Sequence, residues 1–288
     1  MIELPEDCAL TSQLNDILPG KEIENVYANQ SPHKFVTYSG DPERYHDLLQ
    51  GKRFREAVSG TGLTCGGSIE MRFGDMSVVV STPLRYHAPG EKRPARHQRL
   101  IECTDESALS STVQMWGAIF CFPTAHPTPP EGWLGSSAPH PLRPGFDEAY
   151  FRRLLANTDP KYSVKAFLAT GQRIPGVGNG VIQDVMFHAR LHPKRWLCTL
   201  DDADVSRLYH ALVDTVQDMA RNGGRDTERD LFGCFGGYRT ILSKKTADKP
   251  CPGCGGEIIR EAYLGGNVYY CPHCQPLPEE QKKKRKRG

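Results

Sequence analysis

Cys251-Pro252-Gly253-Cys254 and Cys271-Pro272-His273-Cys274 stand near the end of the chain, with sixteen residues between them. Two Cys-x-x-Cys turns at this spacing are typical of a zinc ribbon, in which two knuckles close around one tetrahedral Zn²⁺. The segment between them is too short and polar to form its own core, so metal binding must stabilise it. Free thiols or two disulfides are the alternatives. The pattern predicts one structural Zn²⁺ held by Cys251, Cys254, Cys271 and Cys274.

The other six cysteines occur singly and without paired spacing, as small thiols do in a reducing compartment. The chain opens on acidic and mixed residues rather than on a secretory apolar segment. No run approaches the roughly twenty apolar residues that a membrane helix needs. We therefore expect a cytoplasmic, nucleoid-associated protein that does not enter a membrane.

The net charge of +2 does not by itself indicate a nucleic-acid partner. Residues 276–288 hold six Lys or Arg against two Glu, a contribution of +4, which leaves −2 for the remainder. An argument for nucleic-acid binding must therefore come from local clusters of charge. We expect the basic tail to be disordered and solvated, with a non-specific attraction to phosphate as the alternative.

The hydrophobic pattern divides the 288 residues into successive parts. After a helical stretch around residues 8–18, short apolar runs alternate with turn residues up to about residue 140, which predicts a β-rich domain. A proline-rich connection over 123–144 precedes helical periods at 147–157, 163–170, 180–189 and 201–222, the last capped by Asp201 and Asp202. The predicted domains are 1–140 (β-rich), 141–245 (helical), 246–275 (zinc ribbon) and 276–288 (tail).

A glycine turn separates the second and third predicted helices. In Ile174-Pro175-Gly176-Val177-Gly178-Asn179, two glycines bracket a valine just before a helix start. Such a turn can bring backbone N–H groups and a helix N-terminus close to an anion. A turn between two packed helices without any ligand is the alternative. Nearby basic residues favour phosphate: Lys161, Lys165, Arg173, Arg190, Lys194 and Arg195.

Taken together, these features resemble the formamidopyrimidine-DNA glycosylase and endonuclease VIII family of base-excision repair enzymes. The resemblance is carried by the glycine turn with Lys165 fourteen residues before Asn179, the Gly223–Thr227 loop and the four-cysteine ribbon. The opening Glu3-Leu4-Pro5-Glu6 is similar to the family's N-terminal signature. The resemblance runs from the first residues to Gln275.

The resemblance implies an α+β multidomain fold: an N-terminal β-sandwich with a leading helix, a helix–two-turns–helix domain and a C-terminal zinc ribbon. It implies a monomer that grips damaged or abasic double-stranded DNA between its halves. Asn179 and Lys165 would contact phosphates with the turn glycines Gly176 and Gly178.

The segment Gln114-Met115-Trp116-Gly117 falls where the family carries a phenylalanine that wedges into the base stack. An aromatic ring there can occupy part of the space left by an extruded base. By this resemblance Gln114 and Trp116 are candidate DNA contacts. A buried strand aromatic is the alternative for Trp116.

Three positions depart from the family pattern. The family uses the amine of a proline at position 2, exposed by removal of Met1, as the nucleophile that attacks the sugar, but this chain has Ile2. If Met1 remains, its own amine is the terminal nucleophile, displaced by one residue, which should slow the reaction by orders of magnitude. Two family cations align with Gly62 and Gly266, so we expect weaker phosphate binding and a lower salt dependence.

Glu3 and Glu6 remain as candidate catalytic residues beside Met1. In the family, the first glutamate acts as acid and base around the deoxyribose, and a carboxylate can also activate water. The leading hypothesis is a DNA glycosylase that hydrolyses N-glycosidic bonds of oxidised bases, with doubtful lyase activity. The alternative is a catalytically inactive lesion-binding protein on the same scaffold, and a solvated Glu3 beside a terminus is the structural alternative.

Overall fold

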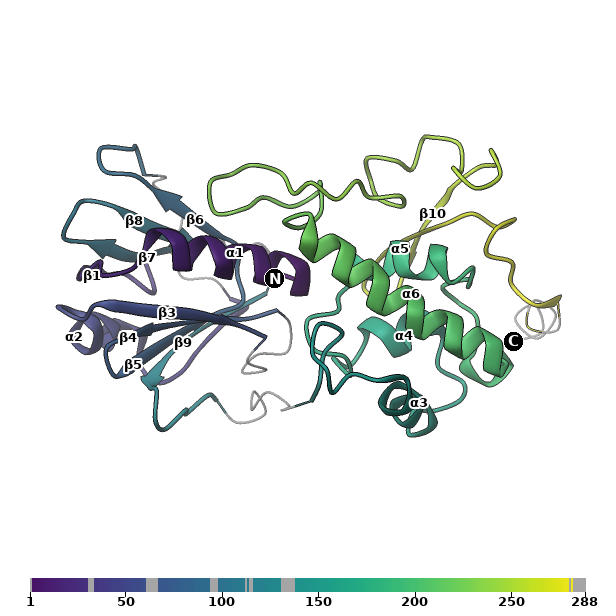
Figure 1. The fold of residues 1–288 in the computed structure, drawn as a ribbon, viewed down its shortest axis with the longest axis horizontal. Helices are drawn as coiled ribbons and strands as arrows, with labels where there is room; N and C mark the ends of the chain where they lie inside the picture. The colour runs from purple at the N-terminus through teal and green to yellow at the C-terminus, as the bar shows by residue number, and fades with distance from the viewer. Residues whose placement is uncertain are drawn as a thin grey trace. The chain divides into compact units, whose positions relative to one another are not determined.

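The computed structural model describes residues 2–30, 34–60, 67–93, 98–111, 113, 116–130, 138–279 and 281. The chain forms two compact units, drawn together in Figure 1. Unit 1 comprises residues 1–138 and 223–237, and unit 2 comprises residues 139–222 and 238–288. Both helices and strands occur, as the predicted α+β class requires.

Unit 1 is a β-sandwich with a leading helix. One sheet has the order β2-β9-β5-β4-β3 and the other the order β1-β7-β8-β6. Residues of both sheets share one hydrophobic core, which includes Met71 and Val78 from the first sheet and Leu109 from the second. The elements are α1 (Leu4–Ile17), β1 (Ile23–Val26), β2 (Val36–Tyr38), α2 (Tyr45–Leu49), β3 (Phe54–Ser59), β4 (Ile69–Phe73), β5 (Met76–Val80), β6 (Leu84–His87), β7 (Gln98–Cys103), β8 (Ala108–Ser111) and β9 (Gly117–Pro123).

The leading helix α1 begins earlier than its apolar pattern suggested. The predicted start was near residue 8, whereas α1 begins at Leu4, with Pro5 in its first turn. Proline is favoured there because its missing N–H would have no partner inside the helix. The Glu3 side chain precedes the helix and makes no capping hydrogen bond. Two acidic side chains, Glu6 and Asp7, therefore lie in the first turn of α1.

Unit 2 is helical and carries the β-hairpin of the ribbon. Its elements are α3 (Glu148–Ala156), α4 (Val164–Ala169), α5 (Val181–His188), α6 (Asp202–Arg221), β10 (Ile259–Tyr263) and β11 (Gly266–Tyr270). The four predicted helices are confirmed, and Asp201 caps α6 through a capping box with Asp204. Asp202, predicted as a second cap, is instead the first helical residue. Aromatic contacts such as Phe151 on Phe167, 5.4 Å between ring centroids, fill the space between helices.

The units differ from the predicted domains in two places. Residues 223–237, assigned to the helical domain from the sequence, belong to unit 1. Leu231 is fully buried in the core of unit 1, and its backbone accepts a hydrogen bond from Tyr86 N–H over 2.8 Å. Gln281, placed in the predicted disordered tail, is buried and donates to the Lys194 carbonyl over 2.6 Å. The disorder predicted for residues 282–288 lies outside the described residues.

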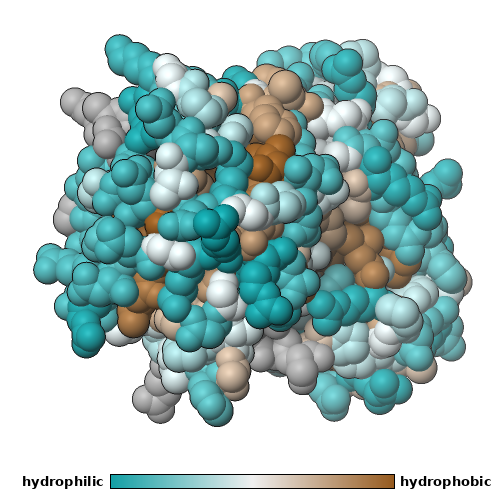
Figure 2. All heavy atoms as spheres, turned by 60° about the vertical axis from the view of Figure 1, so that its left-hand side comes forward, coloured by the Kyte–Doolittle hydropathy of each residue, from teal (hydrophilic) through white to brown (hydrophobic). Residues whose placement is uncertain are grey.

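Hydrophilic side chains dominate the face shown in Figure 2, with apolar side chains confined to small areas. Across the described part of the chain, none of the helices has the length and apolar character needed to span a membrane.

Candidate functional site

The start of the chain is held inside unit 1 by its backbone. Ile2 is buried, its N–H donates to the Ser81 carbonyl over 3.0 Å, and its carbonyl accepts from Gly67 N–H over 3.2 Å. A Cβ atom on Gly67 would lie 3.0 Å from the Glu3 backbone, so glycine suits this close approach. The Ile2 nitrogen is thus a hydrogen-bonded amide. The interpretation of Met1 as a nucleophile lies outside the described residues.

Glu6 is bound by Arg225, which lies in the 223–227 loop and was not predicted as its partner. Arg225 Nε and Nη2 donate to the two carboxylate oxygens over 2.9 and 2.8 Å, and the Arg225 backbone N–H donates over 3.0 Å. Burial lowers the pKa of the Arg225 guanidinium, but the charges of Glu3 and Glu6 outweigh this effect and raise the pKa overall. No spacing rule relates positions so far apart, so only the fold reveals the pair.

Glu3 lies on the other side of the same guanidinium. Its Oε2 atom is 3.5 Å from Arg225 Nη1, and its side chain is 16% exposed, against 6% for Glu6. Of the two glutamates, Glu3 is therefore the one whose carboxylate both keeps access to solvent and faces a fixed positive charge. Such a group can bind and deprotonate a water molecule.

A cavity of about 280 Å³ opens beside Glu6 and Arg225 within unit 1. Gly233 has φ +80°, a left-handed conformation that favours glycine, and its Cα lies close to the end of the Arg85 side chain. The Arg229 guanidinium lies over the Phe235 ring, 4.3 Å from its centroid. The lining combines cations with apolar groups: Ile2, Glu6, Arg85, Arg225, Arg229 and Phe235.

Asp7 is fully buried one residue beyond Glu6. Its Oδ2 accepts hydrogen bonds from Gly60 N–H over 3.0 Å and Ser68 N–H over 3.1 Å, while Thr11 donates to Oδ1. Burial raises the pKa of Asp7 to about 7, against the lowering effect of these hydrogen bonds. Asp7 thereby holds the backbone at Gly60 and at Ser68. The interpretation of Gly62 lies outside the described residues.

Trp116 directly precedes β9 and is exposed, so the alternative of a buried strand aromatic is wrong. Its ring centroid lies 4.9 Å from that of Phe35, which precedes β2. Phe35 was not among the predicted DNA contacts, because nothing in its sequence position relates it to Trp116. Gln114 lies outside the described residues.

The glycine turn of unit 2 meets the ribbon hairpin. Gly176 has φ +72°, a left-handed conformation that favours glycine, and α5 begins two residues after Asn179. Asn179 Nδ2 donates to the Asn267 carbonyl over 3.1 Å. A Cβ atom on Gly266 would lie 3.3 Å from the Asn179 amide. A side chain at position 266 would crowd the Asn179 amide, so glycine suits the close approach of the hairpin to Asn179.

Lys165 anchors the same hairpin from α4. Its side chain is almost fully buried, and Nζ donates to the Tyr263 carbonyl. Burial lowers the pKa of Lys165. The Lys194 ammonium pairs with Glu261 at 2.5 Å and lies over the Tyr263 ring, 5.3 Å from its centroid. Two predicted phosphate-binding cations are thus drawn toward the ribbon.

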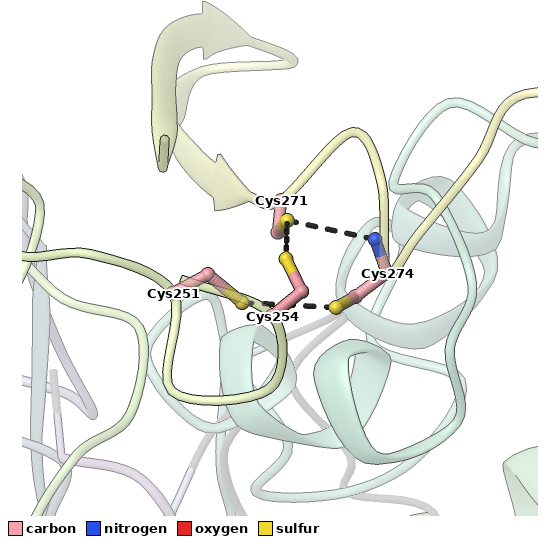
Figure 3. A group of neighbouring side chains, drawn as sticks. All are labelled: Cys251, Cys254, Cys271 and Cys274. Carbon is pink, nitrogen blue, oxygen red and sulfur yellow. Dashed lines mark hydrogen bonds between the residues drawn. The ribbon is translucent and has the colours of Figure 1, made fainter. Parts of the chain in front are cut away.

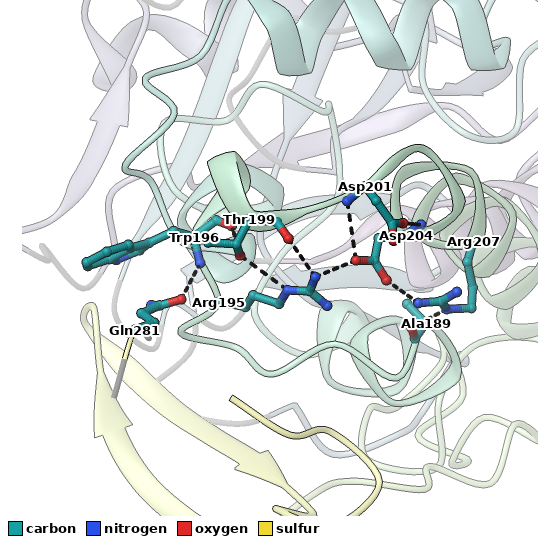
Figure 4. A network of polar contacts seen from close by, with 8 residues as sticks. All are labelled: Ala189, Arg195, Trp196, Thr199, Asp201, Asp204, Arg207 and Gln281. Atoms are coloured by element: carbon teal, nitrogen blue, oxygen red, sulfur yellow. Dashed lines mark hydrogen bonds and ion pairs between the residues drawn. The ribbon is translucent and has the colours of Figure 1, made fainter. Parts of the chain in front are cut away.

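A third cation of the predicted basic neighbourhood has a structural partner. Figure 4 shows Arg195 directed at Asp204, with Nη2 2.5 Å from Oδ2, and Arg207 directed at the other carboxylate oxygen. Because Asp204 also completes the α6 capping box, these ion pairs fix the start of that helix. Arg195 consequently offers less free positive charge than its sequence position suggested.

The four predicted cysteines point toward one another (Figure 3). Their sulfur atoms lie within 4.8 Å of one another. The Sγ atoms of Cys251 and Cys274 are 3.7 Å apart, and those of Cys254 and Cys271 are 3.5 Å apart. Thiolates about 2.3 Å from a tetrahedral Zn²⁺ are about 3.8 Å apart, whereas a disulfide needs about 2.05 Å. The cluster could therefore hold a metal ion.

Comparisons with known proteins agree with this architecture. Residues 137–230 match the family described as the formamidopyrimidine-DNA glycosylase H2TH domain. The chain is 27% identical to the formamidopyrimidine-DNA glycosylase of Brevibacillus brevis, over 96% of this chain and 99% of that protein. The corresponding protein of Geobacillus kaustophilus is also 27% identical, over 96% of this chain and 100% of its own length.

Solved structures share the fold at lower identity. The MutM (Fpg) protein of Thermus thermophilus aligns over 96% of this chain and 99% of its own, with a TM-score of 0.76 and 23% identity. Lactococcus lactis Fpg in complex with abasic-site DNA aligns over 95% and 99%, with a TM-score of 0.77 and 20% identity.

Proposed function

Because the chain belongs to the formamidopyrimidine-DNA glycosylase family, we propose that it is a DNA-repair glycosylase that binds damaged or abasic duplex DNA. The observation that carries the proposal is the similarity to curated glycosylases over 96% of the chain. The relative of known structure that was solved with abasic-site DNA supports the choice of ligand. In this role the protein would act as a monomer on DNA in the cytoplasm.

Glu3 is the residue proposed to carry the chemistry. Its carboxylate, held beside Arg225, takes a proton from a water molecule, whose oxygen attacks C1′ of the damaged nucleotide. The N-glycosidic bond breaks, and the base leaves with the bonding electrons. Glu6 takes no part in proton transfer, since Arg225 occupies both of its oxygens. It acts as a positioning residue for Arg225.

The hydrogen bond from Ile2 N–H to Ser81 argues against an amine nucleophile at position 2. Strand cleavage through a Schiff base requires an amine, so the proposed reaction is base hydrolysis without efficient lyase activity.

Phosphate binding is assigned to unit 2, and base contact to unit 1. Asn179 and the turn glycines Gly176 and Gly178 are proposed to receive a phosphate at the start of α5. Lys165 supports this assignment because its buried ammonium has three N–H groups. One donates to the Tyr263 carbonyl, so the others can donate to a phosphate. Trp116 and Gln114 remain proposed base-stack contacts. One structural Zn²⁺, bound by the four cysteines, would keep the hairpin closed on Asn179.

Two measurements test the proposal. Fluorescence anisotropy with abasic and intact duplexes at low salt should show tighter binding to the abasic duplex. Base release from duplexes with oxidised purines or pyrimidines should occur without a borohydride-trapped covalent adduct. No binding to abasic DNA would contradict the proposed function. Binding without any base release would favour the lesion-binding alternative, and a trapped adduct would contradict the hydrolytic mechanism.

A further inference from the structure

Phe35 and Trp116 form an exposed aromatic pair on unit 1. Their ring centroids are 4.9 Å apart with 33° between the planes, and the residues are 41% and 53% exposed. Large exposed aromatic side chains that lie together are a feature of binding surfaces. Phe35 and Trp116 therefore form a candidate binding surface.

The two residues are fixed by the sheet. Phe35 directly precedes β2 and Trp116 directly precedes β9, and these strands run parallel with Val36 opposite Gly117. The Gly117 N–H donates to the Phe35 carbonyl over 3.1 Å. The backbone therefore sets the spacing of the rings before any ligand binds, which reduces the entropy that binding must overcome.

The charge beside the pair selects an anionic partner. The exposed Lys34 ammonium lies over the Phe35 ring, 5.5 Å from its centroid. A positive charge next to exposed aromatic rings is the combination with which proteins bind unpaired nucleic-acid strands, because bases stack on the rings while cations meet phosphates. A protein surface would be a less specific match, since it lacks both flat base faces and a regular phosphate chain.

We propose that Phe35 is a second base-stacking residue, which together with Trp116 receives an unpaired nucleobase of damaged DNA while Lys34 meets a neighbouring phosphate. This inference rests on the proposed function and adds to it the part of the DNA that unit 1 contacts. An intact duplex has no free base face, whereas an abasic site removes the partner of one base and part of the stack of its neighbours. The base opposite the abasic site is the unpaired one, whereas the base beside the site keeps its partner but has one exposed face.

The test measures affinity for abasic and intact duplexes with the full chain and Phe35 variants. We expect Phe35→Ala to weaken binding to the abasic duplex by roughly ten-fold and to leave binding to the intact duplex unchanged. Phe35→Tyr should retain affinity because it keeps a π face. Phe35→Leu should behave like Phe35→Ala, because leucine fills space beside Trp116 but cannot stack. Tyr27→Ala, which removes another aromatic ring of unit 1 with 40% exposure, is the matched control.

The fluorescence of 2-aminopurine identifies the base that stacks. The probe is placed either opposite the abasic site or directly beside it, and quenching that depends on Phe35 marks the occupied position. If the wild-type protein binds abasic DNA and Phe35→Leu binds it equally well, Phe35 only supports Trp116 and the proposal is overturned. A dimer in sedimentation that Phe35→Ala dissociates would assign the pair to a contact between two copies. If the wild-type protein binds no abasic DNA, the proposed function fails instead.

Discussion

Glu6 and Arg225, 219 positions apart, form a buried bidentate ion pair with N–O distances of 2.9 and 2.8 Å. Both side chains are less than a tenth exposed. The pair ties the first turn of α1 to the segment that returns to unit 1 after α6. It also sets the charge that faces Glu3, so one contact links the stability of unit 1 to its proposed chemistry.

The single substitutions of this ion pair should destabilise the protein by more, in sum, than the double substitution does. We expect Arg225→Gln to lower the free energy of unfolding by roughly 3–5 kcal/mol, because Glu6 is left as a buried charge without its partner. Glu6→Gln should cost less, because Glu3 still lies 3.5 Å from the Arg225 guanidinium. The double variant should be destabilised by less than the sum, since both groups are then neutral amides. Urea unfolding at pH 7 provides the measurement. Strict additivity of the two substitutions would show that the residues do not interact.

Glu3→Gln should separate chemistry from binding. We expect base release from lesion-containing duplex to fall by roughly 10²- to 10⁴-fold, because the amide cannot accept a proton from water. Affinity for abasic DNA should not decrease, since the substitution removes a negative charge near a polyanion. Thermal unfolding of the same variant serves as the control for stability. An unchanged rate of base release would remove Glu3 from the mechanism.

The sequence predicted those features that depend on local spacing. Two Cys-x-x-Cys turns predict a metal cluster, and Asp201 predicts a helix start. Both predictions work because metal-binding turns and helix caps involve residues a few positions apart. Arg225 could not be paired with Glu6 by the same reasoning, since a contact across 219 positions depends on the whole fold. For the same reason Lys165 and Lys194 looked like free cations, although their partners lie on a distant hairpin.

Asp7 should make the stability of the protein depend on pH. Its pKa of about 7 lies above the ordinary value of 3.8, so the folded state binds more protons than the unfolded state between these values. The contribution of Asp7 to the free energy of unfolding should therefore be largest below about pH 4, fall by at most about 1.4 kcal/mol per pH unit as pH rises toward 7, and level off above that.

Asp7→Asn provides the control, because its amide oxygen can still accept from Gly60 and Ser68. The difference in unfolding free energy between wild type and Asp7→Asn, measured by urea unfolding from pH 4 to 8, isolates the contribution of Asp7. A difference that does not change with pH would mean that Asp7 titrates alike in both states.

Removal of the metal should uncouple the hairpin from α5. We expect the purified protein to contain one Zn²⁺ per chain, and Cys254→Ala or exhaustive chelation to lower affinity for abasic DNA by at least roughly ten-fold, because the loop facing Asn179 loses its support. Metal analysis and anisotropy give the readouts. The exposed thiol of Cys198 lies outside the cluster, so Cys198→Ala is the matched control. Full DNA affinity without bound metal would contradict this role.

The salt dependence of binding tests the proposed contact between Lys165 and a phosphate. A cation that meets a phosphate releases about one counterion, so Lys165→Gln should lower the slope of log affinity against log salt by about one. Lys249→Gln is the matched control, because it removes one exposed positive charge from the same unit. If Lys165 serves only to hold the Tyr263 carbonyl, affinity will fall while the slope keeps its wild-type value. The two variants together thus distinguish a phosphate contact from an anchor of the hairpin and from a general effect of charge.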